Sequence, residues 1–385
     1  MGSRSTQPAT ATTKMTLTPV MTLEYQKDSG WIRSIAYFLN GKRIISASSD
    51  KTIRKWDLQA GKEVEEVDVY EGNLAEVSRD GRWLTTTGGD GEYKLKAYGV
   101  ETGIVKRFQD PRKISCFDIS ADGKLLASGS EIDRTVLIWG MDTDELVAGP
   151  FGSDDSVGAV QFSSDSKKLA VESSVRKCLE VWDVQTQKLD ARVGKKCGGH
   201  IISVPHMFWT KKGTILAAFS FDFDNWQYSE PTTIYEFDAS TLETVGDPFE
   251  GHTDIISQLA LSSDGTLLAS SSFDNTIKLW AFEPRHLLAS FDVLPKLVHP
   301  YTLTFSPDIH QLAYAVYRKI FICNTPPDIL ARIRLAPHAQ AIVRICCIYP
   351  IADVLISSSR SIHLTIQPST SYSMCTLHCS IYLHY

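Results

Sequence analysis

The chain has 385 residues, 43% of them hydrophobic and 10% aromatic, so it can bury a substantial core. Its formal net charge of −6 disfavours a nucleic-acid-binding protein, because phosphate contacts need a concentrated lysine and arginine surface. The eight cysteines follow neither a disulfide nor a zinc spacing, and no secretory leader opens the chain, so we expect reduced thiols, no metal and a location in the cytoplasm or, alternatively, the nucleus.

The N-terminal segment divides into two parts. Residues 1–16 are rich in Ser, Thr and Ala, which predicts a disordered tail. Residues 17–23 carry apolar side chains that predict a short strand. No apolar run in the sequence approaches the length that is needed to span a bilayer.

From residue 32 onward one pattern recurs: an apolar alternating run, a polar pair containing Gly or Asp, a second apolar run, a polar turn, and a third run that ends near an aromatic residue. Seven such units and a shorter eighth follow in order, at residues 32–57, 74–99, 114–140, 157–183, 199–238, 251–280, 303–335 and 337–366. The second unit is degenerate, and Cys323 stands in the seventh where other units have Trp. The tail at residues 367–385 lacks the pattern, and we expect it to be irregular.

The sixth unit is the most complete copy. Gly251-His252 opens it, the Asp264-Gly265 pair follows the first run, and Asp274-Asn275 follows the second run. Ile277 and Leu279 then alternate before Trp280. These features predict three strands joined by two tight turns.

This unit resembles the WD-repeat family, in which Gly-His opens a unit of about 40 to 45 residues and Trp-Asp closes its third strand. Ala281 replaces the closing Asp here, and in the first unit Asp28 stands at the position of the family's His. The resemblance covers residues 17–366 and implies an all-β fold, a β-propeller of four-stranded antiparallel blades.

Counting the short unit at residues 337–366 gives eight blades, with seven as the alternative. The eighth unit lacks a fourth strand, and residues 17–23 match the missing strand. We therefore expect the N-terminal strand to pair with the last blade and to close the ring, because closure removes open strand edges. A chain without a stable closed ring is a further alternative.

Three residues of the sixth unit, Ser270, His252 and Asp274, are of the types found in a hydrolase triad. The resemblance implies instead that His252, Ser270, Asp274 and Trp280 form a buried structural hydrogen-bond network that ties the blade together. Nothing in the sequence supplies an exposed nucleophile, an oxyanion site or a phosphate-binding loop. We expect no catalytic residues, no cofactor and no enzyme activity.

The strongest functional signal is an insertion in the fifth unit, Phe221 to Pro231, which carries Phe223, Trp226 and Tyr228. The resemblance places this turn on the face of the ring that is used for binding, and aromatic residues on loops make good interface anchors. Trp31 and Phe273 point to the same rim. The alternative for these aromatics is packing among neighbouring loops. The acidic residues Asp222, Asp224 and Glu230 favour a partner segment that carries Lys or Arg.

The function that we expect is a non-catalytic scaffold that binds a peptide or protein on the face bearing the insertion. The alternative is a propeller enzyme or small-molecule binder that uses the central channel, which would need convergent polar groups at the channel mouth. We expect no nucleic-acid partner and no membrane span.

Overall fold

The computed structural model describes residues 15–25, 30–50, 52–64, 70–71, 74–78, 81–87, 95–195, 207–222, 231–293 and 302–333. Two compact units divide the chain, Met1–Pro326 and Pro327–Tyr385. In the second unit the described residues 327–333 form a short helix. No helix in the described ranges is long and apolar enough to cross a membrane.

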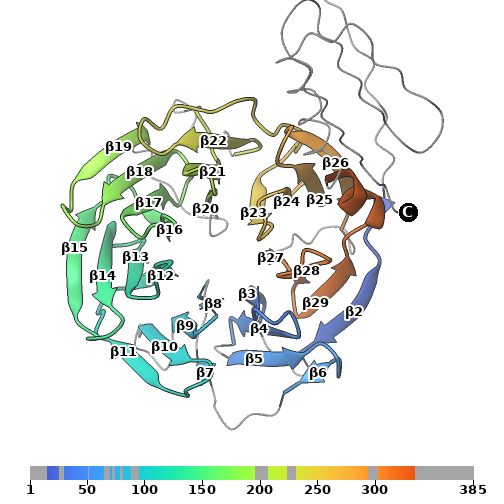
Figure 1. The fold of residues 1–385 in the computed structure, drawn as a ribbon, viewed down its shortest axis with the longest axis horizontal. Coiled ribbons are helices and arrows are strands. Elements are labelled where there is room, and N and C mark those ends of the chain that lie inside the picture. The colour runs from blue at the N-terminus through green and yellow to red at the C-terminus, as the bar shows by residue number, and fades with distance from the viewer. Residues whose placement is uncertain are drawn as a thin grey trace, which may run out of the picture. The chain divides into compact units, whose positions relative to one another are not determined.

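The first unit is a β-propeller of seven blades, each an antiparallel sheet, arranged as a ring (Figure 1). Blade one contains β3 (Ile32–Tyr37), β4 (Arg43–Ser48), β5 (Thr52–Asp57), β6 (Lys62–Glu63) and β7 (Tyr70–Glu71). Blade two contains β8 (Leu74–Val77), β9 (Trp83–Thr87), β10 (Leu95–Gly99) and β11 (Val105–Phe108). Blade three contains β12 (Ile114–Ile119), β13 (Leu125–Ser130), β14 (Thr135–Gly140) and β15 (Leu146–Gly152).

Blades four to seven complete the ring. Blade four contains β16 (Val157–Phe162), β17 (Lys168–Ser173), β18 (Cys178–Asp183) and β19 (Leu189–Gly194), and blade five contains β20 (Met207–Trp209), β21 (Thr214–Ala218) and β22 (Ile234–Asp238). Blade six contains β23 (Ile256–Leu261), β24 (Leu267–Ser272), β25 (Thr276–Ala281) and β26 (His286–Asp292). Blade seven contains β27 (Thr302–Phe305), β28 (Gln311–Val316) and β29 (Lys319–Asn324), together with β2 (Pro19–Glu24).

The predicted fold class is confirmed, but the main expectation of eight blades is wrong and the alternative of seven is right. Strand β2 pairs with β29, so the N-terminal strand completes blade seven and not a blade built from residues 337–366. Blade seven does not form its own fourth strand, because residues 327–333, which follow β29 almost at once, form a helix that Pro327 begins. Residues 337–366 and the tail at 367–385 lie outside the described residues.

The N-terminal segment fastens two blades. Strand β1 (Met15–Thr16) lies at the end of the stretch that we expected to be disordered, and it pairs in parallel with β26 of blade six. The chain then continues as β2 on blade seven, where buried Leu23 packs with Ile320 and Ile322 and with Ile32 and Ile35 of blade one. The ring is therefore closed by both backbone pairing and apolar packing across the junction of blades seven and one.

Blade five has an irregular outer edge. Three strands are assigned to it, and residues 244–249 take the place of the fourth through isolated bridges between Phe237 and Thr244 and between Ile234 and Phe249. The guanidinium group of Arg285, from the turn between β25 and β26 of blade six, donates hydrogen bonds to the carbonyls of Val245 and Asp247 and to the buried Glu236 carboxylate. A side chain of the neighbouring blade thus holds this edge in place.

The two faces of the ring differ in their connections. On one face, called here the loop face, lie the turns between the second and third strands of each blade and the connections from one blade to the next. Residues 30–31, 174–177, 219–222, 273–275 and 317–318 belong to the loop face. The opposite face, the hairpin face, carries the turns between first and second strands, such as residues 38–42.

Candidate functional site

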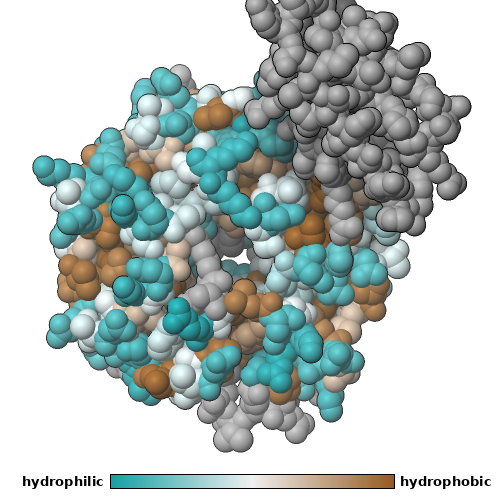
Figure 2. All heavy atoms as spheres, in the orientation of Figure 1, coloured by the Kyte–Doolittle hydropathy of each residue, from teal (hydrophilic) through white to brown (hydrophobic). Residues whose placement is uncertain are grey.

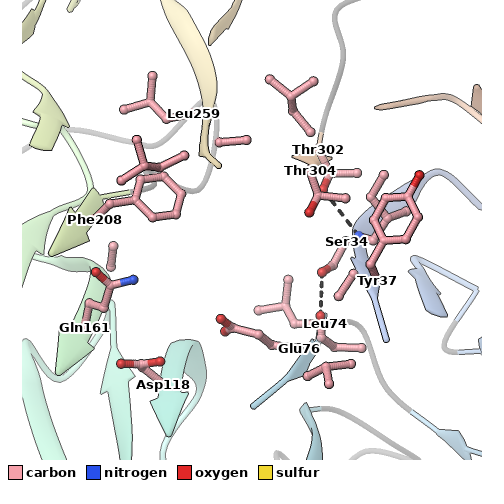
Figure 3. Close-up of a pocket in the computed structure, with 18 of the residues that line it drawn as sticks. Ser34, Tyr37, Leu74, Glu76, Asp118, Gln161, Phe208, Leu259, Thr302 and Thr304 are labelled. Carbon is pink, nitrogen blue, oxygen red and sulfur yellow. Dashed lines mark hydrogen bonds between the residues drawn. The ribbon is translucent and has the colours of Figure 1, made fainter. Parts of the chain in front are cut away.

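The seven innermost strands enclose a central channel. A cavity of about 380 Å³ lies in it and is lined by residues of β3, β8, β12, β16, β20, β23 and β27. Figure 2 shows the ring hollowed at its centre, and Figure 3 shows Glu76, Asp118, Gln161 and Phe208 around the cavity. Few charged side chains line it: Arg33, Glu76 and Asp118.

Several of the channel's polar groups already hold the blades together. The Asp118 carboxylate accepts a hydrogen bond from the Phe162 N–H at 2.7 Å, and the side-chain oxygen of Gln161 accepts one from the Trp209 N–H at 2.6 Å. Ser34 donates to the Ala75 carbonyl at 2.6 Å. Each bond joins neighbouring blades, so these groups act first as structural links.

The structure brings the four residues of the sixth-unit network into one hydrogen-bonded chain. The indole N–H of Trp280 donates to the Ser270 hydroxyl at 2.8 Å, Ser270 Oγ lies 2.7 Å from His252 Nε2, and His252 Nδ1 lies 2.8 Å from the Asp274 carboxylate. Because Ser270 accepts from Trp280, its own proton is directed to Nε2, and Nδ1–H then donates to Asp274.

Burial and hydrogen bonding together set the charges in this network. Burial lowers the pKa of the His252 imidazole, against the opposite effect of Asp274, so the ring stays neutral. Burial alone would raise the pKa of the Asp274 carboxyl, but hydrogen bonds from His252, Thr276 and Thr253 outweigh it and lower the pKa. Ser270 is buried and bonded on both sides, so its hydroxyl is not an accessible nucleophile.

We expect His252→Ala to lower the free energy of unfolding by about 1–3 kcal/mol, because it leaves Ser270 and Asp274 short of a buried partner. Urea denaturation at neutral pH measures this change, with exposed His310→Ala as the control. An unchanged midpoint would show that the network adds nothing to stability.

Two other blades contain the same network with different residues. In blade three, Ser128 accepts from Trp139 at 3.0 Å and donates at 2.7 Å to Asp110, whose carboxylate binds the Arg112 guanidinium through contacts of 2.9 and 2.6 Å. Asp110 takes the place of histidine here. The sequence held a signal for it, because 18 positions separate Asp110 from Ser128 and also His252 from Ser270.

In blade one the partner is a tyrosine. Ser46 accepts from Trp56 at 2.7 Å and lies 2.9 Å from the Tyr25 hydroxyl, and the Arg54 guanidinium lies over the Tyr25 ring. Asp28, which we assigned to the histidine position, lies outside the described residues, and Tyr25 fills the role instead. Blades one and three therefore carry such a network without a histidine.

Blade four carries a buried carboxyl group that the sequence analysis did not single out. Glu172 on β17 has no exposed surface, and neither of its oxygens has a hydrogen-bond partner in the described part of the chain. Burial raises its pKa to about 8, against the lowering effect of Arg176. Arg176 directs its guanidinium to the carbonyls of Ile256 and Ser257 on blade six.

This carboxyl makes stability depend on pH. The folded chain keeps the Glu172 proton up to about pH 8, whereas the unfolded chain loses it near pH 4.5, so stability falls as the pH rises through this window. Glu172→Gln should therefore unfold like wild type at pH 5 but be more stable at pH 9, by about 1–4 kcal/mol. Denaturant titration at both pH values tests this, with exposed Glu243→Gln as the control. Equal differences from wild type at the two pH values would contradict it.

The predicted partner-binding residues fall into two groups. Phe223, Trp226 and Tyr228, with Asp224 and Glu230, lie outside the described residues. Trp31 is 48% exposed on the loop face, and its ring lies 5.8 Å from that of Tyr317, which is 41% exposed. Phe273 is half-buried on the same face.

At the described edge of the insertion the aromatics pack together. Phe221 lies 5.0 Å from Phe219 and 5.1 Å from Tyr235, ring centre to ring centre. The alternative of local packing therefore applies to Phe221, although part of its ring stays exposed. Among the described residues no group of three or more His, Cys, Asp or Glu side chains could hold a metal ion.

Comparison with known proteins identifies the repeats. The model of the WD domain, G-beta repeat, matches residues 17–57, 104–140 and 243–281. These segments are the ones that carry the Tyr25, Asp110 and His252 networks. The WD repeat-containing protein SL1-17 of Schistosoma mansoni is 42% identical over 65 residues, which is 17% of this chain and about a fifth (21%) of that protein. Together with the seven-bladed propeller, these matches support a WD-repeat family for this chain.

Proposed function

We propose that this chain is a non-catalytic scaffold that binds a peptide or protein partner on its loop face, where the blade-five insertion begins and ends. WD40 propellers are typically protein-interaction scaffolds and are generally non-catalytic. The observation that carries the proposal is the exposed pair of Trp31 and Tyr317, because large aromatic side chains in contact with solvent are a common feature of interface centres.

The backbone around this pair supports the proposal. The N–H of Trp31 donates to Ser49 Oγ at 2.8 Å, the Trp31 carbonyl accepts from Ser49 at 2.9 Å, and the Tyr317 carbonyl accepts from Ile32 at 2.7 Å. The two rings are thus presented by fixed backbone, and a partner would not have to order it on binding.

The test is affinity capture from native lysate with wild type and a Trp31→Ala/Tyr317→Asn variant, with Asn chosen because Tyr317 has a φ of 53°. Leu39→Ala is the control, because Leu39 is 55% exposed on the hairpin face. We expect specific proteins to be lost with the loop-face variant and kept with the control, at unchanged melting temperature. Capture of the same proteins by both variants would contradict the proposal.

A small-molecule binder that uses the channel is the second candidate, and the cavity of about 380 Å³ favours it because ligand pockets begin near this size. Against it, Asp118 and Gln161 already bind backbone groups of the next blade. A metabolite screen by thermal shift, repeated on Phe208→Ala, distinguishes the two candidates: a stabilising compound that the variant no longer binds would favour the channel.

We also propose that the protein works in the cytoplasm or nucleus. The described cysteines Cys116, Cys178 and Cys323 are buried free thiols, which suits a reducing compartment. Cell fractionation with an antibody to the chain tests this location.

A further inference from the structure

Four of the inner strands share an irregularity near the loop face. Each has a register shift against its neighbouring strand, so that one extra residue is inserted close to the strand's start. The shifts fall between Ile32 and Ser34, Ile114 and Cys116, Val157 and Ala159, and Ile256 and Gln258, and the extra residues are Arg33, Ser115, Gly158 and Ser257.

Three of these extra residues are small and held inside the ring. Ser115 Oγ donates to the Val157 carbonyl of the next blade at 2.9 Å, Gly158 is buried, and the Ser257 carbonyl accepts from Arg176 at 3.1 Å. Arg33 differs, because it is exposed, lines the channel cavity, and forms no hydrogen bond or ion pair with another described residue. Packing of the ring therefore does not account for an arginine at this position.

Aromatic side chains near Arg33 supply an apolar surface beside its positive charge. Trp31 lies two residues earlier on the same inner-strand segment, and Trp31 packs edge-on against Tyr317. The carboxylates that line the cavity, Glu76 and Asp118, lie near the far ends of β8 and β12, toward the hairpin face. Among the described residues that line the channel, the charge nearest the loop face is thus positive.

We propose that Trp31, Arg33 and Tyr317 form a subsite that binds an Asp or Glu side chain of a partner peptide, with an apolar neighbour of that acidic residue lying against the two rings. The inference rests on the proposed scaffold function and adds the chemistry of the partner. An arginine guanidinium matches a carboxylate in geometry as well as charge, and a carboxylate that enters from the loop face meets Arg33 before it meets Glu76 or Asp118.

The test is selection of short random peptides, displayed on phage, against the immobilised full chain. We expect the selected peptides to be enriched in Asp or Glu next to an aromatic or aliphatic residue. A synthetic peptide with the strongest enrichment should bind Arg33→Glu about tenfold or more weakly than wild type, bind Arg33→Lys with an intermediate loss, and bind more weakly as salt is raised. Arg107→Glu, an exposed arginine on the outer strand β11, is the matched control and should leave affinity unchanged.

The remaining outcomes distinguish the proposed scaffold function from the proposed carboxylate subsite. If binding is lost in Trp31→Ala but Asn or Gln replaces the acidic residue of the peptide without effect, the scaffold function stands and the carboxylate subsite is wrong. If amidation of the peptide's C-terminus abolishes binding and side-chain replacement does not, the ligand is a chain terminus and the side-chain assignment is overturned. If no peptide is enriched, or if enriched peptides bind all the variants equally, the carboxylate subsite is wrong, and the affinity capture with the loop-face variant decides the scaffold function separately.

Discussion

Replacing Arg285 by Ala should lower the free energy of unfolding by about 3–5 kcal/mol, one of the two largest effects that we expect from a single substitution. Arg285 and Glu236 form a buried ion pair between blades six and five, and Thr214 also donates to the Glu236 carboxylate. Removal of the guanidinium leaves the Glu236 charge without its cation in a buried position. Residues 244–249 lose the side chain that binds the carbonyls of Val245 and Asp247.

Urea denaturation measures the total effect, and amide hydrogen exchange in residues 244–249 measures the local one. Glu236→Gln in the Arg285→Ala background should recover part of the loss, since it removes the stranded charge and keeps an acceptor for Thr214. Lys212→Ala breaks a solvent-exposed pair with Glu283 between the same two blades and should cost no more than about 0.5 kcal/mol. Equal losses for Arg285→Ala and Lys212→Ala would rule out a special role for the buried pair.

The fold could be predicted because similar turn and strand signals recur from one blade to the next. Asp264-Gly265 and Asp274-Asn275 mark the two turns of blade six, and the structure has strands on either side of both. Blade number was harder to predict, since residues 337–366 carry an apolar pattern like that of a blade. A local signal was present: Pro326 and Pro327 stand at the start of a helix, so the residues after β29 form no strand and β2 supplies the fourth one.

The hydrogen-bond networks were only partly predictable, because residues of different chemical type can play the same role in different blades. Asp110 and Tyr25 reach the buried serines of their blades just as His252 does, although the three side chains differ in shape and in functional group. Any acceptor or donor of suitable reach can satisfy a buried hydroxyl. The 18-residue spacing leads from Ser128 to Asp110, which a search for histidine misses. The same spacing leads from Ser46 to Asp28, whereas Tyr25 lies 21 residues before Ser46.

The sequence alone could not have identified Arg33 and Tyr317 as binding residues or Glu172 as a carboxyl group with a raised pKa. Arg33 is directed to the channel by a bulge whose position depends on pairing with β4, and Tyr317 meets Trp31 only when the ring closes. The raised pKa of Glu172 depends on its burial in blade four, where Arg176 turns its guanidinium toward blade six. Each of these features depends on strand pairing or on packing between blades.

Leu23→Asp should lower the free energy of unfolding by about 3 kcal/mol or more, or prevent cooperative folding altogether. Leu23 is buried on β2, in the apolar cluster that joins blades seven and one, so the substitution places an unpaired charge at the closure of the ring. Val20→Asp introduces the same carboxylate on the same strand, but Val20 is 54% exposed. The expected loss in free energy of unfolding is therefore about 0.5 kcal/mol or less.

Chemical denaturation of the two variants, with size-exclusion chromatography of each, measures the difference. A ring closed by β2 predicts an expanded or unstable Leu23→Asp protein beside a compact Val20→Asp protein. Equal stability of the two would mean that closure does not depend on β2 and that another segment can complete blade seven. Because Tyr25, the residue that binds Ser46 in blade one, lies directly after β2, loosening of this strand should also disrupt the blade-one network. Ring closure and the internal hydrogen bonds of blade one are therefore expected to be lost together.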